Sequence, residues 1–456
     1  MMDNNKFMTN EKDICSETLS YLSGVSVFSK IRASPVLKEF EALLTTIEEY
    51  TDKPRALISA WASFTSTLAE HNRGRTFFMY VVDLMIADEN AFTLQAERGE
   101  VNTASLAFSM AENDLKRISM VADFDLPMLA IYISDMLWKA KCDDGARLVD
   151  FGVRTIGKLR EHNHLLIQKE KPYALFEAPN AMVFADYIKN TGAGLFGKHN
   201  FFYWKRGAGL KPALNPDRVR LSELSGYEDE RRVIIDNTER FLSGASANNL
   251  LLYGDRGTGK SAAVKAVCNE YRERGIRLIE LRKCDLDEIP ELMEKLSCRG
   301  LFFVLFIDDL SFEKQDDDFT MLKAMLEGGS DVKPNNVVVY ATSNRRHFVK
   351  ESFSDRPNLE QLSNGDVRAF DTMQEQLSLA DRFGITILFS APSQEEFVRI
   401  AEFIAERRSL FPCNDREKFK KNALVWERWF NGRSPRTAHQ FVEWVASGVR
   451  FPWEDG

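Results

Sequence analysis

One segment constrains the fold more than any other part of the sequence, the run from Gly254 to Ser261. It reads GDRGTGKS and matches the pattern GxxxxGK(S/T), directly after the apolar run NLLLY and directly before a helical pattern. Glycines let the backbone curl so that its N–H groups face a phosphate, and the first turn of the following helix adds unpaired donors. The segment therefore predicts a P-loop. A glycine-rich turn without a ligand is the alternative, and the strand and helix around the segment disfavour it.

The P-loop prediction gives a role to particular side chains. Lys260 is expected to reach the β and γ phosphates of ATP, and the Ser261 hydroxyl is expected to bind magnesium. ATP and Mg²⁺ are therefore the predicted cofactors. The predicted phosphate-binding residues are Gly254, Asp255, Arg256, Gly257, Thr258, Gly259, Lys260 and Ser261.

A second element, LFFVLFIDDLSFE, places Asp308 and Asp309 at the end of a fully apolar strand. Parallel sheets bind ligands at the carboxyl ends of their strands. Asp308 is expected to hold magnesium through water, and Asp309 is expected to face the water that attacks the γ-phosphate. Without the P-loop some fifty residues earlier, two carboxylates after a strand could equally cap the next helix.

The spacing of apolar residues along the chain changes near residue 205. Before it, apolar residues recur at helical spacing, as in Leu57, Trp61, Phe64 and Leu68, which predicts an all-α domain over 1–204. The Gly-, Pro- and Lys/Arg-rich run at 205–219 predicts a linker. Short apolar runs alternating with helical patterns over 220–410 then predict an α/β domain, and 411–456 predicts a small helical appendage.

The α/β domain is expected to contain a five-stranded parallel sheet. Its strands are predicted at Asn249–Tyr253, Arg277–Leu281, Leu301–Ile307, Val337–Ala341 and Ile385–Ser390, and helices at Lys260–Arg274, Pro290–Cys298, Phe319–Glu327, Gln394–Arg408, Asp415–Phe430 and Pro435–Ala446.

Composition limits the kinds of protein this chain can be. The net charge of -8 disfavours a general nucleic-acid coat, and the six scattered cysteines give neither a CxxC pair nor zinc-finger spacing. The longest early apolar run, Phe77 to Ile86, is interrupted by Asp83 and is about half a membrane span. With no secretory signal at the start, a cytoplasmic protein without a membrane partner is expected.

At this point a family resemblance becomes visible. Residues from about Leu221 to Trp444 resemble an AAA+ ATPase module, most closely an uncharacterised bacterial family of predicted AAA+ ATPases that is catalogued as a domain of unknown function. In LSELSGYEDERRVIIDNTERFLSG, the resemblance places Gly226 and Tyr227 near adenine. An amphipathic helix alone would look the same.

Three further residues take their roles from this resemblance. VVVYATSNRR resembles the sensor 1 strand, with Asn344 orienting the attacking water, and LSLADRFGITI resembles the segment that carries the arginine finger at Arg382. GRSPRTAHQFVEWV resembles sensor 2 of a C-terminal helical lid, with Arg436 contacting phosphate. Taken alone, these would be a turn residue, a surface ion-pair residue and part of a helix N-terminus.

The chain departs from the AAA+ pattern at one position. AAA+ enzymes commonly carry Asp-Glu at the acidic strand end, and this chain has Asp308-Asp309. The shorter Asp309 carboxylate stands about one methylene farther from the water, so slow hydrolysis is expected. Glu313 is a conceivable substitute that is not favoured. The N-terminal half also resembles the uncharacterised family, notably in DLMIADENAFTLQAERGE.

Three further features are not interpreted as catalytic or metal sites. KHNFFYWKRGAGLKP mixes aromatic and basic residues as single-strand binders do, but docking of the helical domain onto the α/β core is favoured. His162 and His164 are interpreted as a surface turn rather than a metal site, and His439 and Trp444 as packing residues.

The resemblance implies an oligomeric ATPase that remodels a protein or nucleoprotein partner gripped by the N-terminal domain. The alternative is a nucleotide-controlled binding switch or scaffold with slow turnover. A GTPase or small-molecule kinase is disfavoured because the chain has no NKxD motif, and polypeptide threading because no aromatic-apolar-Gly loop lies between Lys283 and Leu292. A homo-oligomer is expected, and nucleic acid is not the favoured partner.

Overall fold

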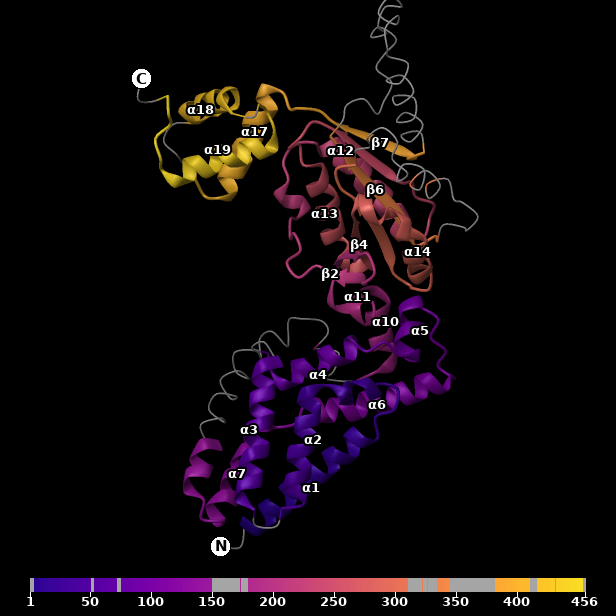
Figure 1. Cartoon of the computed structure of the whole chain (residues 1–456), viewed down its shortest axis with the longest axis vertical. Helices are drawn as coiled ribbons and strands as arrows, with labels where there is room; N and C mark the ends of the chain where they lie inside the picture. The colour runs from indigo at the N-terminus through magenta and orange to yellow at the C-terminus, as the bar shows by residue number, and fades with distance from the viewer. Residues whose placement is uncertain are drawn as a thin grey trace, which may run out of the picture. The chain divides into compact units, whose positions relative to one another are not determined.

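A computed structural model of the chain describes residues 4–50, 53–71, 75–149, 173, 179–310, 322, 326, 334–344, 382–410, 416–430 and 432–453. The chain divides into two compact units, Met1–Lys198 and His199–Gly456 (Figure 1). The expected helix at Phe319–Glu327 lies outside the described residues, apart from two isolated positions. None of the helices in the described ranges has the length and apolar character needed to cross a membrane.

The first unit is helical throughout its described part. Its helices are α1 Asn4–Ser23, η1 Ser29–Ala33, α2 Pro35–Glu48, α3 Pro54–His71, α4 Phe77–Ile86, α5 Ala91–Arg98, α6 Leu106–Ala122, α7 Leu126–Lys139, α10 Ala181–Thr191 and α11 Leu195–Lys198. The helix ends follow from capping chemistry: Ser34 accepts from Leu37 N at the start of α2, and Asn90 forms a capping box at α5.

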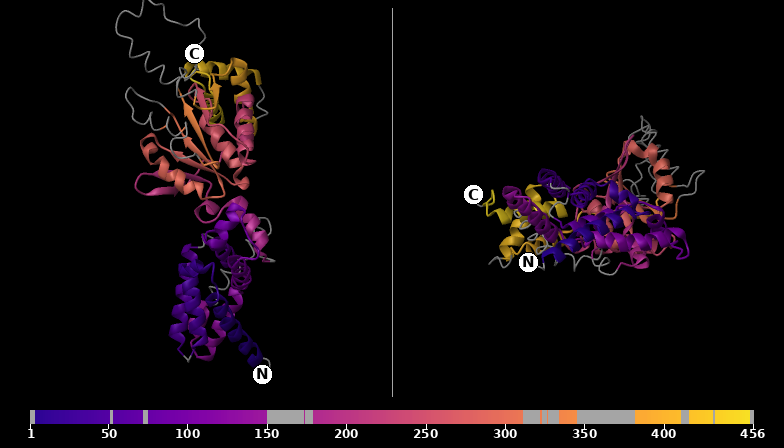
Figure 2. Two further views of the ribbon diagram at one scale, coloured as in Figure 1. Left: turned by 90° about the vertical axis from the view of Figure 1, so that its right-hand side faces the viewer. Right: turned by 90° about the horizontal axis from the view of Figure 1, so that it is seen from below.

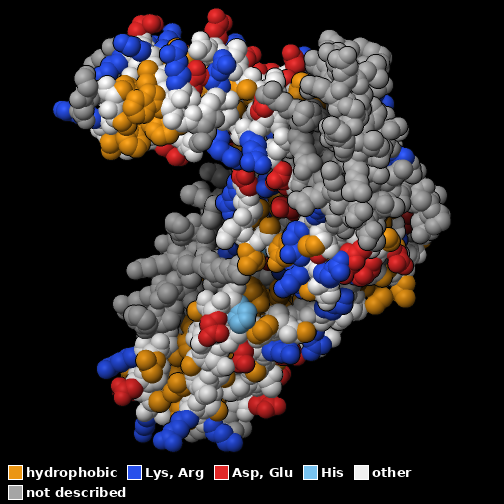
Figure 3. Space-filling view, turned by 45° about the horizontal axis from the view of Figure 1, so that its top comes forward, with side chains coloured by type: hydrophobic (Ala, Val, Ile, Leu, Met, Phe, Trp, Pro, Cys, Tyr) orange, Lys and Arg blue, Asp and Glu red, His pale blue; other side chains and the backbone are white. Residues whose placement is uncertain are grey.

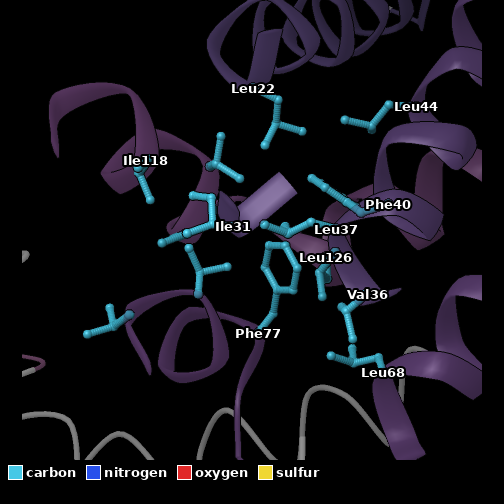
Figure 4. Close-up of a cluster of buried hydrophobic side chains, with 14 of the residues drawn as sticks. Leu22, Ile31, Val36, Leu37, Phe40, Leu44, Leu68, Phe77, Ile118 and Leu126 are labelled. Carbon is cyan, nitrogen blue, oxygen red and sulfur yellow. The ribbon is translucent and has the colours of Figure 1, made fainter. Parts of the chain in front are cut away.

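The core of this unit is apolar and aromatic. Phe40 packs its ring 5.4 Å from that of Phe64 and 4.9 Å from that of Phe77, among the leucines and isoleucines of Figure 4. The buried Asp114 carboxylate accepts from the backbone N–H groups of Ser26, Val27 and Phe28, which fixes the turn before η1. Burying a charge is costly unless it is hydrogen-bonded, so the three N–H groups of this turn stabilise the Asp114 carboxylate.

The second unit is built on one sheet with helices on both faces (Figure 1, Figure 2). The sheet has the order β2-β1-β4-β5-β6-β3-β7, with every neighbouring pair parallel except the antiparallel pair β1–β2. The strands are β1 Phe201–Lys205, β2 Gly209–Pro212, β3 Leu250–Gly254, β4 Ile276–Leu281, β5 Phe302–Ile307, β6 Val337–Ser343 and β7 Ile385–Phe389.

Helices α12 (Glu228–Leu242) and α13 (Lys260–Glu270) pack on one face of this sheet, and α14 (Ile289–Ser297) lies on the other (Figure 1). Short 3₁₀ turns complete the unit: η2 Leu221–Glu223, η3 Arg272–Arg274 and η4 Lys283–Glu288. The core between α12, α13 and the sheet includes Ile234 and Phe241 from α12 and Val264 from α13.

The five expected strands are all present, but the expected total of five is wrong because the sheet has seven. Of the two extra strands, β1 lies at the end of the stretch expected to be all-α, 1–204, and β2 lies in the expected linker, 205–219. The backbone of β1 is hydrogen-bonded to β4 in a parallel ladder. Side chains alternate between the two faces of the strand, and those of Phe202 and Trp204 are buried. These two aromatic side chains pack inside the second unit.

Three C-terminal helices form a separate small core. They are α17 Gln394–Arg407, α18 Arg416–Trp429 and α19 Pro435–Ser447. Phe397 and Ile400 of α17 pack with Trp426 of α18 and Phe441 of α19. The expected boundary at residue 411 therefore falls within this cluster, because α17 buries its apolar stripe against the two later helices.

Candidate nucleotide-binding site

The loop between β3 and α13 has the backbone of a phosphate cradle. Gly254, Gly257 and Gly259 have φ angles of 127°, 75° and 92°, a region that favours glycine. At Gly254 a Cβ atom would also lie 2.3 Å from the carbonyl oxygen of Phe389. The sequence needs glycine here for conformation and for space, and the loop leads directly into the first turn of α13, where N–H groups are unpaired.

Lys260 lies inside this cradle and is 5% exposed. Its Nζ donates to the carbonyl oxygens of Gly254 at 3.2 Å and Asp255 at 2.6 Å, and Thr258 Oγ1 donates to Asp255 O at 2.8 Å. Burial lowers the pKa of Lys260 to about 8, against the opposing pull of the nearby carboxylates, chiefly Asp255. An anionic ligand would replace those carbonyls as the partner of the ammonium group.

The acidic strand end meets the start of α13 and the end of β6. Ser261 Oγ and Thr342 Oγ1 both donate to Asp308 Oδ1, each at 2.6 Å, and Thr342 Oγ1 accepts from Asp309 N at 2.9 Å. A hydroxyl and a carboxylate facing each other are oxygen ligands of the kind Mg²⁺ prefers, with water completing its shell. The described residues contain no cluster of three His, Cys, Asp or Glu for a metal.

Asp309 and Asn344 are also brought together. Asn344 Nδ2 donates to Asp309 Oδ1 at 2.6 Å. Asp309 has a φ of 53°, an uncommon value for a residue with a side chain. Such strain is typical of functional sites, and here it turns the Asp309 carboxylate toward the end of β6.

Tyr227 lines a pocket together with Thr258 and Gly259 of the P-loop, and Gly226 directly precedes Tyr227. The Tyr227 ring stacks on Phe389 with centroids 5.1 Å apart, and its hydroxyl donates to Ser390 O at 2.7 Å. A Cβ atom on Gly226 would lie 3.0 Å from Ile400.

Tyr227 lines a pocket that runs from the P-loop to the C-terminal helices. Its volume of about 40 Å³ is far below the roughly 300 Å³ of a small-ligand pocket, so a nucleotide base would fit here only if these walls moved apart. The lining residues are Leu224, Ser225, Tyr227, Arg231, Thr258, Gly259, Ala263, Phe389, Ile400, Ile404, Pro435 and His439.

The start of α19 touches the P-loop directly. Arg436 N donates to Gly257 O at 3.3 Å, and the charge of Arg436 contributes to lowering the pKa of Lys260. His439, one turn further along, lines the pocket described above.

Arg382 is placed apart from this cluster. It precedes β7, and the parallel register pairs Leu250 with Ile385 and Gly254 with Phe389. Arg382 therefore lies at the amino end of β7, whereas the P-loop lies at the carboxyl end of β3. Glu313, His162 and His164 lie outside the described residues.

Sequence reasoning missed one site residue and one contact of another. Thr342 is buried and joins both acidic residues, and its signal was a polar side chain at the end of an apolar strand. Asp255 was predicted to bind phosphate, but no local pattern predicts that its Oδ2 accepts from Ala391 N at 2.7 Å.

Comparison with known proteins places the second unit in a family. A family model described as "Protein of unknown function (DUF815)" matches residues 197–449. No curated protein matches the sequence. The expectation of an uncharacterised family is thus confirmed.

Among solved structures, the Thermotoga maritima RuvB Holliday junction branch migration motor matches with a TM-score of 0.33 and 18% identity, over 50% of this chain and 64% of that chain. A variant of the same protein matches with a TM-score of 0.34 and 17% identity, over the same shares. The chain thus spans less than two thirds of these structures. At these TM-scores no function is carried over from them.

Proposed function

The chain belongs to the family described as protein of unknown function (DUF815), and we propose that it is an AAA+ protein that binds and hydrolyses ATP with magnesium at the carboxyl ends of β3, β5 and β6. The observation that carries this proposal is the hydrogen-bonded series Ser261–Asp308–Thr342–Asp309–Asn344 beside the buried ammonium of Lys260. It joins the ends of β5 and β6 to the P-loop helix at the edge where α/β sheets bind ligands.

Each residue has a defined task in this proposal. The P-loop amides and Lys260 bind and orient the triphosphate, and Ser261 and Asp308 hold the metal ion. ATP supplies the phosphoryl group, and magnesium offsets its negative charge. Asp309 accepts a proton from the attacking water, and Asn344 holds that carboxylate in place through its amide. Arg436 approaches the phosphates from α19, which acts as the lid together with α17 and α18.

Ligand binding to the lysine variant tests the proposal. Lys260→Ala is expected to weaken ATP binding at least roughly a hundredfold because the ammonium is the only side-chain cation buried inside the loop among the described residues. Lys211→Ala, an exposed lysine on β2, is the matched control and should bind normally. GTP binding equal to ATP binding would argue against an adenine site. Lack of ATP affinity in the unmodified protein would remove the proposal altogether.

The second candidate is a nucleotide-controlled switch with slow turnover. The Asp309 side chain favours this candidate, because it is one methylene shorter than glutamate and already accepts a hydrogen bond from Asn344. Asp309→Glu is expected to raise the turnover number roughly tenfold or more if the short side chain limits the reaction. An unchanged turnover number would show that another step limits hydrolysis.

We further propose that the ATPase works as a homo-oligomer that remodels a protein or nucleoprotein partner held by the helical unit. This rests on the AAA+ resemblance of the sequence and on the position of Arg382 away from its own P-loop. Size measurement with and without ATP and magnesium tests it, and a monomer under both conditions would contradict it.

A further inference from the structure

A second pocket lies on the α13 face of the same sheet, at the carboxyl ends of β1 and β4. Its volume of about 530 Å³ falls within the range of small-ligand pockets, roughly 300 to 1,000 Å³. Tyr203 and Lys205 of β1, Lys265 of α13, Glu280 and Arg282 at the end of β4, and Asn215 line it. None of these residues has a role in the nucleotide site proposed above.

The wall formed by β1 is held rigidly from the opposite face. Trp204 Nε1 donates to Glu288 Oε2 at 2.6 Å, Arg206 pairs with Asp287, and the Lys295 ammonium lies 5.2 Å from the Trp204 ring centroid. Together with the ladder to β4, these contacts fix the β1–β2 hairpin on the sheet. The pocket is therefore preformed, which lowers the ordering cost of binding.

The chemistry of the lining suits a ring that carries an anionic group. The Tyr203 side chain is 43% exposed although its strand neighbours are buried, so it presents a ring to the pocket. Lys205 points from the same face of β1 and makes no ion pair within the described residues, whereas Lys265 lies 3.9 Å from Glu280. Glu280 and Asn215 add acceptors for hydroxyl or amino hydrogens.

The pocket also borders the acidic end of β5. Lys265 lies one helical turn after Ser261 on α13, and its Nζ is 5.9 Å from the ring centroid of Phe306, two residues before Asp308. The register pairs Leu281 with Ile307, so Arg282 follows β4 at the level of Asp308. A ligand here would contact the same helix and strand ends as the nucleotide site.

We propose that this pocket binds one nucleoside monophosphate unit, with its base on Tyr203 and its phosphate on Lys205 and Lys265. The unit is either a free nucleotide or part of a single nucleic-acid strand, since both present the same ring, sugar hydroxyls and phosphate. The site is separate from the P-loop and does not depend on the function proposed above.

Binding to the Lys260→Ala variant tests this site without the P-loop. Fluorescent AMP and a fluorescent thymidine trinucleotide are titrated separately into Lys260→Ala protein, then into Lys260→Ala combined with Tyr203→Ala, Lys205→Gln or Lys211→Gln. Tyr203→Ala and Lys205→Gln are each expected to weaken binding at least roughly fivefold. Lys211→Gln changes an exposed lysine of the same hairpin that does not line the pocket, and it should have no effect.

The two probes separate the two sources of ligand. Saturable AMP binding that needs Tyr203 and Lys205 assigns a free nucleotide, and binding of the trinucleotide alone assigns a single strand; either supports the site. The proposal is overturned if neither probe binds, or if Lys205→Gln and Lys211→Gln weaken binding equally. Lys205 is exposed, so its variant keeps the test valid even if Tyr203→Ala fails to fold.

Discussion

Thr342 connects the two acidic residues of the proposed site. Its hydroxyl donates to Asp308 Oδ1 at 2.6 Å and accepts from Asp309 N at 2.9 Å, and its side chain is 2% exposed. With Ser261 on the same Asp308 oxygen, Thr342 fixes the direction of that carboxylate. It also holds the backbone at the residue with positive φ. Thr342 is thus a positioning residue for both carboxylates.

Thr342→Val is expected to change the magnesium requirement. Valine keeps the shape but leaves the Asp309 N–H without an acceptor and removes one of the two donors to Asp308 Oδ1, a cost of roughly 1–3 kcal/mol. The magnesium concentration for half-maximal ATPase activity should rise several-fold and the turnover number should fall about tenfold, while ATP affinity without magnesium stays the same. Thr342→Ser restores the hydroxyl and should restore both values. An unaltered magnesium dependence in Thr342→Val would rule out the positioning role.

Asp88 in the first unit is a buried carboxylate. Its side chain is 1% exposed, and its Oδ1 lies 3.9 Å from Lys30 Nζ. Burial raises the pKa of Asp88 to about 6. Because the folded-state pKa is raised, the folded chain holds this proton more tightly than the unfolded chain. Through Asp88, stability increases as pH falls from above 6 toward the ordinary value near 4, and no further below it.

Asp88→Asn is accordingly expected to stabilise the first unit at pH 7.5. Removing the buried charge should raise Tm by roughly 3–6 °C, and the gain should shrink at pH 5, where Asp88 of the unmodified protein is already protonated. Thermal unfolding at both pH values measures this. Asp13→Asn, at an exposed position of α1, is the control and should change little at either pH. An equal gain at pH 5 and pH 7.5 would contradict the titration of Asp88.

At the scale of the elements, two residues of the proposed nucleotide site, Asp255 and Tyr227, hold the connection from β7 to α17. Asp255 Oδ2 accepts from Ala391 N at 2.7 Å, and the Tyr227 hydroxyl donates to Ser390 O at 2.7 Å. Both contacts hold the hinge at which the C-terminal helices leave the sheet. A ligand that moves the P-loop or Tyr227 therefore changes the anchoring of α17.

Asp255→Ala is expected to release this hinge. A hydrogen bond to a charged group contributes roughly 1.5–3 kcal/mol, so exchange of the Ala391 amide hydrogen should accelerate about tenfold or more. Hydrogen-exchange mass spectrometry of the peptide around Ala391 measures this, and Asp255→Asn, which keeps an acceptor oxygen, should exchange slowly. Equally fast exchange in Asp255→Asn and Asp255→Ala would mean that loop shape, not this hydrogen bond, holds the hinge.

The sequence patterns identified those strands and helix ends that are determined by residues close together in the chain. The five apolar strands and the cap of α17 at Ser393 follow from period and capping, which a sequence displays directly. The strand at Phe201–Lys205 was missed because the basic and glycine residues after it resemble a linker and its pairing with β4 is nonlocal. The contacts of Thr342 and Asp255 join segments far apart in the chain, so no spacing rule could reveal them.

At the scale of the whole molecule, two features suit an assembly of several chains. Exposed apolar residues gather on the C-terminal helices, where the side chain of Trp429 is 60% exposed, that of Phe430 41% and that of Val449 53% (Figure 3). Clustered exposed apolar side chains mark interaction surfaces. In addition, Arg382 lies at the amino end of β7, about 13 Å of strand away from the edge that carries the P-loop.

Arg382 is therefore expected to act on the site of another copy, and mixed variants can test this directly. Arg382→Ala should lower the turnover number by roughly a thousandfold while ATP affinity stays unchanged, since a finger acts on the transition state. Lys260→Ala should be inactive because its own loop is empty. Mixing the two inactive variants should restore activity, because the Lys260→Ala chain supplies the arginine and the Arg382→Ala chain supplies an intact P-loop. Arg232→Ala, an exposed arginine of α12, is the control and should remain active. Mixtures that stay inactive while size measurements show mixed assemblies would exclude action between chains.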